Sequence, residues 1–384
     1  MNELPQAHRS TPAGKLRARG AGIPFDGDPG AANAITDVPG VAVGYTTLIS
    51  GDGPLVVGRG PVRTGVTAIL PRGLDKAGSV VWAGVASLNG CGEMTGFAWV
   101  DEAGRCEGPI MLTNTHACGT ARDATIRWLS RRPSQRADSD SRFWLPVAAE
   151  TYDGELNDID GGHVREEHVF AAIEAARGGR IEEGSVGGGT GMRCYQWKAG
   201  SGTASRIVRI GDDAYCVGAF AQANFGRRYM CTLGGIPVGR EFPVAQAPQA
   251  TLESGSLIVV VATDAPLLPH QLRRLARRPA MAMARSGGVS AHYSGDIFLA
   301  FSTANERAVL EAERVANVRY LPDQTLTPIF EAAIQAADEA IVNSFVGTAA
   351  MTGRDGHTVE GFPVAAAQAL LRKHGRLVDV REHA

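Results

Sequence analysis

The chain has 384 residues, 44% of them hydrophobic, so it is long and apolar enough to bury a large core. Its formal net charge is -2 and it contains no long basic run, which argues against a nucleic-acid-binding or membrane-surface protein. No stretch approaches the ~20 apolar residues of a membrane helix, and the N-terminus lacks the apolar core of a signal peptide. We therefore expect a soluble, cytoplasmic protein that acts on a small molecule or a peptide.

The first thirty-odd residues, rich in Pro, Gly and Arg, predict an irregular arm. Strands are expected after the arm, at residues 64–70, 79–87, 143–150, 206–210 and 214–221. Apolar residues at helical spacing predict helices over residues 164–177 and 328–345.

The last third begins with a strand at residues 256–262, continues with a basic helix near residues 271–285 and returns in a strand at residues 297–301. It ends with two helices, the second opening near Pro363. Strands that precede grouped helices are typical of a layered α+β sandwich and not of an alternating parallel sheet. No internal repeat or long linker is present, so residues 1–384 are expected to form one domain.

Neither a disulfide framework nor a metal site is expected. The six cysteines form no Cys-x-x-Cys pair and are predicted to be buried thiols. His163 and His168 flank two glutamates, but five residues on one helix separate side chains by about 140°, which favours a solvated charged face. We assign no metal and no cofactor.

A Gly-Ser pair leads directly into the apolar strand of the last third. If the chain is cut between Gly255 and Ser256, Ser256 carries both a hydroxyl and a free α-amine at the start of a buried strand. A serine hydroxyl is a weak nucleophile until a base takes its proton, and an α-amine with a pKa of about 7.7–8 can do so at neutral pH. A lone Gly-Ser pair is more often an ordinary turn, so this hypothesis depends on residues elsewhere.

Ser294 and Asp296 precede a second strand much as Gly255 precedes the first. If the two strands pair, these side chains could face the Ser256 hydroxyl and amine and relay a proton or orient the ammonium form. A hydrophilic turn is the alternative, and spacing does not choose between the two.

Three further polar residues follow strands. Asn224 could donate its side-chain amide to a developing oxyanion, or could occupy a left-handed turn before Gly226. Glu150 could hold the positively charged amino end of a substrate, with Tyr152 shaping the pocket, or both could be turn residues.

The glycine-rich run at residues 187–191 lacks the Lys-Ser/Thr ending of a P-loop and has no Rossmann spacing around it. A wall of backbone beside a ligand, or a flexible turn, is expected there instead of a phosphate cradle.

Taken together, these segments resemble the self-processing L-aminopeptidase/D-Ala-esterase/amidase family, which includes the β-peptidyl aminopeptidases. The resemblance is carried by residues 255–269, 292–298 and 150–154, with further matches at 35–41, 89–90, 92–96 and 187–192. It extends from about Arg17 to the last helix.

The resemblance implies a precursor that cleaves itself before the nucleophilic serine, giving chains of residues 1–255 and 256–384. It also implies a four-layer α/β/β/α sandwich, which has the layout of N-terminal-nucleophile hydrolases but the connectivity shared with ornithine acetyltransferase. Tetramers of the cleaved pair are usual in the family.

The resemblance also assigns roles to individual residues. Ser256 matches the nucleophile, Ser294 and Asp296 match the residues that tune it, and Asn224 matches the oxyanion donor. Glu150 matches the anchor for the substrate amino group, with Tyr152 nearby. Some β-peptide-specialised relatives have Glu at position 296 and an aliphatic residue at position 152, so strict β-peptide specificity is not implied.

The implied activity is that of a serine aminopeptidase without a cofactor. It would release small N-terminal residues (L-Ala, Gly, D-Ala or β-amino acids) from peptides, amides or esters through an acyl-enzyme. Acyl transfer as in the ornithine acetyltransferases ranks lower, because those enzymes use a threonine nucleophile. A non-catalytic homologue that stays uncut is the third hypothesis.

Overall fold

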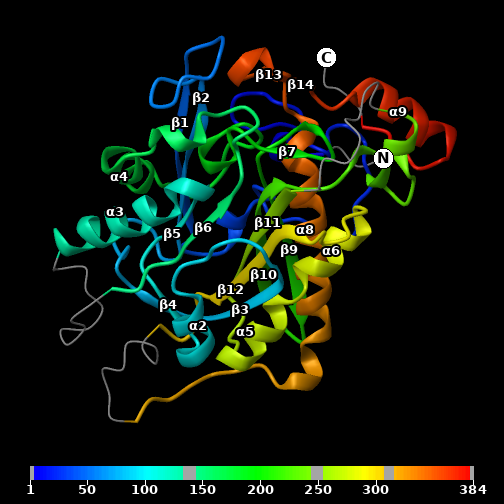
Figure 1. The fold of residues 1–384 in the computed structure, drawn as a ribbon. Helices are drawn as coiled ribbons and strands as arrows, with labels where there is room; N and C mark the ends of the chain where they lie inside the picture. The colour runs from blue at the N-terminus through cyan, green and yellow to red at the C-terminus, as the bar shows by residue number, and fades with distance from the viewer. Residues whose placement is uncertain (1–3, 133–143, 244–253, 307–314, 381–384) are drawn as a thin grey trace.

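The computed structural model describes residues 4–132, 144–243, 254–306 and 315–380. Two main β-sheets form its centre (Figure 1). The four-stranded sheet has the order β1 (Ala42–Ser50), β2 (Val62–Leu70), β5 (Ile110–Asn114), β6 (Ala148–Thr151). The six-stranded sheet has the order β4 (Arg105–Glu107), β3 (Val80–Gly90), β12 (Tyr293–Ser302), β11 (Ser254–Thr263), β10 (Asp213–Asn224), β9 (Ser201–Ile210). Neighbouring strands are antiparallel except for β5–β6 and β11–β12, which are parallel.

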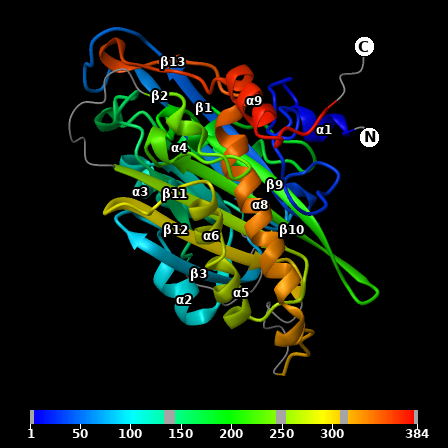
Figure 2. The ribbon, with the colours of Figure 1, turned by 90° about the vertical axis from the view of Figure 1, so that its right-hand side faces the viewer.

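Helices cover the outer face of each sheet. On the four-stranded sheet lie α3 (Cys118–Ser130) and α4 (Glu166–Glu174), and on the six-stranded sheet lie α5 (Pro269–Ala276), α6 (Pro279–Arg285) and α8 (Thr327–Val346). Figure 2 shows α8 crossing over β9 and β10. A third apolar cluster fills the space between the sheets. The layers are therefore α/β/β/α, as the resemblance implies.

Shorter elements complete the described chain. They are the helices α1 (Gln6–Arg9), α2 (Phe97–Ala103) and α9 (Val364–Lys373), the two-stranded ribbons of β7 (Arg193–Cys194) with β8 (Trp197–Lys198) and of β13 (Met351–Thr352) with β14 (Thr358–Val359), and several 3-10 helices of three residues each. The N-terminal arm is irregular except for α1, and it is anchored by the buried ion pair of Arg17 Nε with Glu183 Oε2 at 2.8 Å.

The apolar run of β11 is buried on both faces. Ile258 and Val260 point into the space between the sheets, whereas Leu257 and Val259 point toward the covering helices. Because successive side chains of a strand alternate between the two faces, a strand between two apolar layers needs an unbroken apolar sequence. This requirement explains why the run has no polar alternation.

Most of the expected elements are present, with three differences. The strand expected at residues 143–150 is shorter, Ala148–Thr151, and residue 143 lies outside the described residues. The basic helix near residues 271–285 is two helices, because Pro279 cannot continue the first one and begins α6 instead. The elements β1, β4, β5, α1, α2 and α3 and the two ribbons β7–β8 and β13–β14 were not predicted. Strand β5 has only five residues, all buried, and therefore shows no alternation.

Candidate active site

Ser256 lies near the start of β11, where the antiparallel register of β10 places Asn224 directly opposite it. Both residues are buried, each with 5% of its surface exposed. Side chains two or four residues apart on a strand point to the same face. Ser256 therefore shares the face of Ile258, and Asn224 shares the face of Phe220, so both side chains face the space between the two sheets. Directly opposed residues on one face have Cβ atoms about 4.5–5.5 Å apart, which is close enough for both to contact one substrate group.

The parallel pairing of β11 with β12 brings the second candidate pair to the same place. Gly255, Ser256 and Leu257 align with Ser294, Gly295 and Asp296 respectively. The backbone N–H of Gly295 donates to Ser256 Oγ at 3.2 Å. The two strands therefore pair, which is the condition under which Ser294 and Asp296 could face Ser256.

The Asp296 carboxylate is fully buried and bonds both its neighbour on β12 and the backbone of β11. Its Oδ1 accepts hydrogen bonds from Ser294 Oγ at 2.8 Å and from the Leu257 N–H at 3.0 Å. Since Leu257 follows Ser256 in the chain, the carboxylate is tied to the backbone of the candidate nucleophile.

Asn224 belongs to β10 itself, and the left-handed conformation is found at Gly226, with φ 85°. The side-chain Nδ2 of Asn224 donates to the Tyr152 carbonyl at 2.8 Å, and its Oδ1 accepts from the Arg193 N–H at 3.1 Å. These two bonds fix the orientation of the amide: its oxygen must face the Arg193 N–H, and its nitrogen must face the Tyr152 carbonyl. The turn interpretation of Asn224 is therefore wrong.

Glu150 lies on β6 of the other sheet and is 3% exposed. Its Oε1 accepts from the Glu93 N–H at 2.9 Å, and its Oε2 accepts from the Thr115 hydroxyl. Burial raises the pKa of the Glu150 carboxyl, and the hydrogen bonds oppose that shift.

Gly92 links the Glu150 carboxyl to the serine. A Cβ atom added at this glycine would lie 3.1 Å from Glu150 Oε1 and 2.9 Å from Gly295 Cα, whose own N–H bonds Ser256 Oγ. Residue 92 must therefore be a glycine for the backbone to pass between the two sheets here.

Tyr152 follows β6 and is 38% exposed. Its ring folds back over Gly154, where an added Cβ would lie 2.3 Å from the Tyr152 hydroxyl. Its carbonyl accepts from Asn224, so the backbone of Tyr152 belongs to the same site.

The contacts of Gly92, Arg193 and Gly295 were not predicted from the sequence. Gly92 lies within a segment that resembles the family, and the absence of a side chain was the only feature of the sequence that could have indicated its close contacts.

The glycine-rich run is a buried packing element. Residues Gly187–Gly189 form a 3-10 helix, and a Cβ on Gly188 would lie 2.4 Å from Gln222 Oε1 and 2.5 Å from the Leu112 carbonyl. The glycines therefore allow close approach of backbone to β5 and β10, and the run is not a flexible turn.

Two further expectations need correction. His163 precedes α4 and bonds Asp158 at 2.8 Å, whereas His168 accepts from the Arg165 N–H at the start of α4, so the two histidines do not share a helix. Five cysteines are buried, but Cys91 is exposed because it follows the end of β3. Within the described ranges, no three His, Cys, Asp or Glu side chains are grouped as metal ligands would be.

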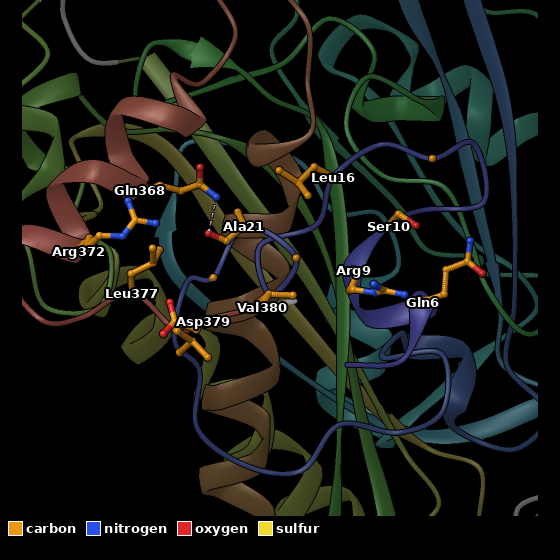
Figure 3. Close-up of a pocket in the computed structure, with 14 residues that line it drawn as sticks. Gln6, Arg9, Ser10, Leu16, Ala21, Gln368, Arg372, Leu377, Asp379 and Val380 are labelled. Atoms are coloured by element: carbon orange, nitrogen blue, oxygen red, sulfur yellow. Dashed lines mark hydrogen bonds between the residues drawn. The ribbon is translucent and has the colours of Figure 1, made fainter. Parts of the chain in front are cut away.

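A surface cavity of about 620 Å³ is lined by residues of α1, of α9 and of the segment that follows α9 (Figure 3). Gln368 Nε2 donates to the Ala21 carbonyl there at 3.1 Å. None of the candidate residues around Ser256 lines this cavity. Among the residues that the structure describes, no helix has both the length and the apolar character needed to cross a membrane.

Residues 33–359 match the model of peptidase family S58. The chain belongs to this family. As an S58 peptidase it is a serine-type aminopeptidase with an N-terminal-nucleophile hydrolase layout, which agrees with its four layers and with a buried serine at the start of a core strand.

Two relatives match this S58 chain over nearly its whole length. It is 49% identical to β-peptidyl aminopeptidase BapA of Sphingosinicella microcystinivorans, over 95% of this chain and 94% of the relative. It is 45% identical to BapA of Sphingosinicella xenopeptidilytica, over 90% and 89% of the two chains.

Solved structures agree. The L-aminopeptidase D-Ala-esterase/amidase of Ochrobactrum anthropi superimposes with a TM-score of 0.88 at 44% identity, covering 94% of this chain and 99% of that one. A β-aminopeptidase of Burkholderia sp. superimposes with a TM-score of 0.84 at 42% identity, covering 96% and 100%.

Proposed function

We propose that the chain cuts itself between Gly255 and Ser256, and that the freed Ser256 is the nucleophile of the aminopeptidase. The observation that carries this proposal is the position of the Ser256 hydroxyl, buried at the junction, opposite Asn224 and bonded by the Gly295 N–H. The products, residues 1–255 and 256–384, share one core, because β10 and β11 pair across the cut.

In the cutting step, Ser256 Oγ attacks the Gly255 carbonyl carbon and the C–N bond breaks. The acyl group moves to oxygen as an ester, the nitrogen becomes the free α-amine, and water then hydrolyses the ester. Asn224 is the proposed donor to the oxyanion formed in this step.

In turnover, Ser256 Oγ attacks the carbonyl of the substrate while its own α-amine accepts the hydroxyl proton. The resulting ammonium returns the proton to the leaving amine, and water hydrolyses the acyl-enzyme. Ser294 and Asp296 are proposed to orient the ammonium form, because they pair with Gly255 and Leu257 on either side of Ser256.

The substrates that we propose are peptides, amides or esters with a small N-terminal residue. Glu150 would bind their ammonium group, since its buried carboxylate lies across Gly92 from the Ser256 site. The relatives named β-peptidyl aminopeptidases favour including β-amino acids among the substrates. The exposed ring of Tyr152 beside the site favours a narrow pocket.

Mass spectrometry of the purified protein tests the proposal directly. Two chains that meet at Gly255 and Ser256 are expected, and a chain that stays whole yet hydrolyses substrate would exclude the mechanism. A panel of L-Ala, D-Ala, Gly and β-Ala amides then defines the substrate preference.

Replacing Gly255 with alanine is expected to slow self-cleavage about tenfold or more. The new Cβ would lie 2.3 Å from the Asn224 carbonyl and 2.9 Å from Phe225 Cα, so the scissile carbonyl must shift. The time course of cleavage after synthesis measures this effect. Once cut, residue 255 no longer belongs to the chain of the nucleophile, so kcat per cleaved molecule should match the wild type; a normal cleavage rate would contradict the prediction.

Replacing Glu150 with glutamine is expected to lower kcat/KM about 10–100-fold, mainly through KM, because a hydrogen bond to a charged group is lost. The pH profile gives a second readout. Since burial raises the pKa of Glu150, its carboxylate is lost at a higher pH than usual as pH falls. In the wild type, the slope of log kcat/KM against pH on the acid side should therefore increase from one to two, because both the α-amine of Ser256 and Glu150 take up a proton. In Glu150→Gln the slope should stay at one.

The exposed neighbour Glu93 offers a matched control, because Glu93→Gln keeps the backbone N–H that bonds Glu150. This variant should retain kcat/KM near neutral pH. Its pH profile should steepen at a lower pH than that of the wild type, because the charge of Glu93 contributes to the raised pKa of Glu150. Equal losses in both variants would show that general charge around the site, and not the Glu150 anchor, determines KM.

We also propose a cytoplasmic location and a homotetramer of cleaved pairs. All six cysteines are free, as is usual in a reducing compartment. The tetramer is proposed from the family resemblance alone, and light scattering of the cleaved protein tests it.

A further inference from the structure

The carboxylate of Asp296 has a third donor that belongs to neither candidate pair. Ser290 Oγ donates to Oδ2 at 2.5 Å, while Oδ1 accepts from Ser294 Oγ and from the Leu257 N–H. A fully buried carboxylate is costly unless its oxygens are hydrogen-bonded, and Ser290 supplies a bond to Oδ2, the oxygen that Ser294 does not contact.

The loop after α6 holds Ser290 in an uncommon conformation. Ser290 has φ 52°, in the left-handed region that residues other than glycine rarely occupy. Gly287 comes so close to Met230 that an added Cβ would lie 1.8 Å from the Met230 carbonyl, and the Thr232 N–H donates to the Ser286 carbonyl at 2.9 Å. The start of the loop is therefore fixed against the segment around residue 231.

The end of the loop is fixed from the other side by Asn89 of β3. The Asn89 side-chain amide donates to the carbonyls of Ala291, His292 and Ser294 at 2.8, 3.0 and 2.7 Å. Anchors on both sides make the Ser290 hydroxyl a pre-oriented donor, which loses little freedom when it bonds Asp296.

We propose that Ser290 is a positioning residue that acts through Asp296. Its hydroxyl holds Oδ2, and this leaves Oδ1 directed at Ser294 and at the backbone that follows Ser256. The inference rests on the proposed function of Ser256. It adds a residue that supports Ser294 and Asp296, which are proposed to orient the ammonium group of Ser256.

The test uses self-cleaved enzyme with Ser290→Gly and Ser290→Asn. Glycine adopts a positive φ without strain, so Ser290→Gly removes the hydroxymethyl side chain without straining the backbone. Asparagine also tolerates the left-handed region and restores an N–H donor. Val289→Gly is the matched control, because it loosens the same loop at an exposed residue and keeps the hydroxyl.

For Ser290→Gly we expect kcat to fall about tenfold, as for a lost hydrogen bond to a charged group, with KM within about twofold. Tm should fall as well, because a buried carboxylate oxygen loses a donor. Ser290→Asn should recover most of kcat, and Val289→Gly should match the wild type. If Ser290→Gly is not cut at all, the cleavage rate replaces kcat as the readout.

Three outcomes would overturn the inference: wild-type kcat in Ser290→Gly, an equal loss in Val289→Gly, or no recovery in Ser290→Asn. Ser256→Ala, tested in parallel, separates this failure from that of the proposed function. If Ser256→Ala is inactive and uncut while Ser290→Gly is normal, only the role of Ser290 falls; if Ser256→Ala is active, the proposed function itself falls.

Discussion

Ser256→Ala is expected to remain a single uncut chain of 384 residues and to lose aminopeptidase activity by at least ~10⁴-fold. The expectation follows from one hydroxyl serving two steps: it attacks the Gly255 carbonyl during cleavage and the substrate carbonyl during turnover. Removing a buried hydroxyl that accepts one backbone hydrogen bond should leave the fold intact. Denaturing mass spectrometry measures the cleavage, and initial rates on an alanine amide measure the turnover.

Two control variants sharpen this test. Ser254→Ala should be cut and should turn over as the wild type does, because the proposed nucleophile is retained. Ser256→Cys keeps a nucleophilic atom at the same position and should restore partial cleavage. Cleavage of Ser256→Ala at the same bond would disprove the assigned nucleophile, whereas loss of activity in Ser254→Ala would move it upstream.

The second large effect is expected at Asn224. Replacing it with aspartate should lower kcat about 10²–10³-fold with little change in KM, since an oxyanion donor acts in the transition state. Aspartate keeps the size of the side chain and an acceptor for the Arg193 N–H, but it removes the amide donor. The measurement is kcat and KM on self-cleaved enzyme, together with the cleavage rate itself.

Gln222 provides a control on the same face of β10, two residues before Asn224. Its amide bonds the Thr113 carbonyl and the Thr151 hydroxyl between the sheets. Gln222→Met should therefore lower the free energy of unfolding by about 1–3 kcal/mol and leave kcat of the folded enzyme unchanged. A kcat for Asn224→Asp that stays within a few-fold of the wild type would remove Asn224 from the oxyanion site.

Residues that follow or begin strands could be located from the sequence alone. The apolar run after Ser256 indicates a strand buried on both faces, and Glu150, Asn224 and Ser294 stand at strand ends, where sites are often built. Their types already suggested a nucleophile, an anchor and a donor, and the family resemblance assigned those roles.

The register between strands could not be predicted in this way. Ser256 and Asn224 are 32 residues apart in the chain and Ser256 and Gly295 are 39 apart, and only the pairings of β10, β11 and β12 bring them together. Pairing depends on which faces bury apolar area in the whole sheet, and a single segment does not contain this information.

The Gly255-Ser256 junction shows the division most clearly. Its proposed chemistry follows from the sequence, because a serine that a cut makes N-terminal carries a hydroxyl and an amine on one residue. Its surroundings were decided by the tertiary structure: Gly92 against Glu150, and Ser290 on Asp296. These contacts join segments from both sheets and a loop, and they form only when the packed core fixes the distance between the layers.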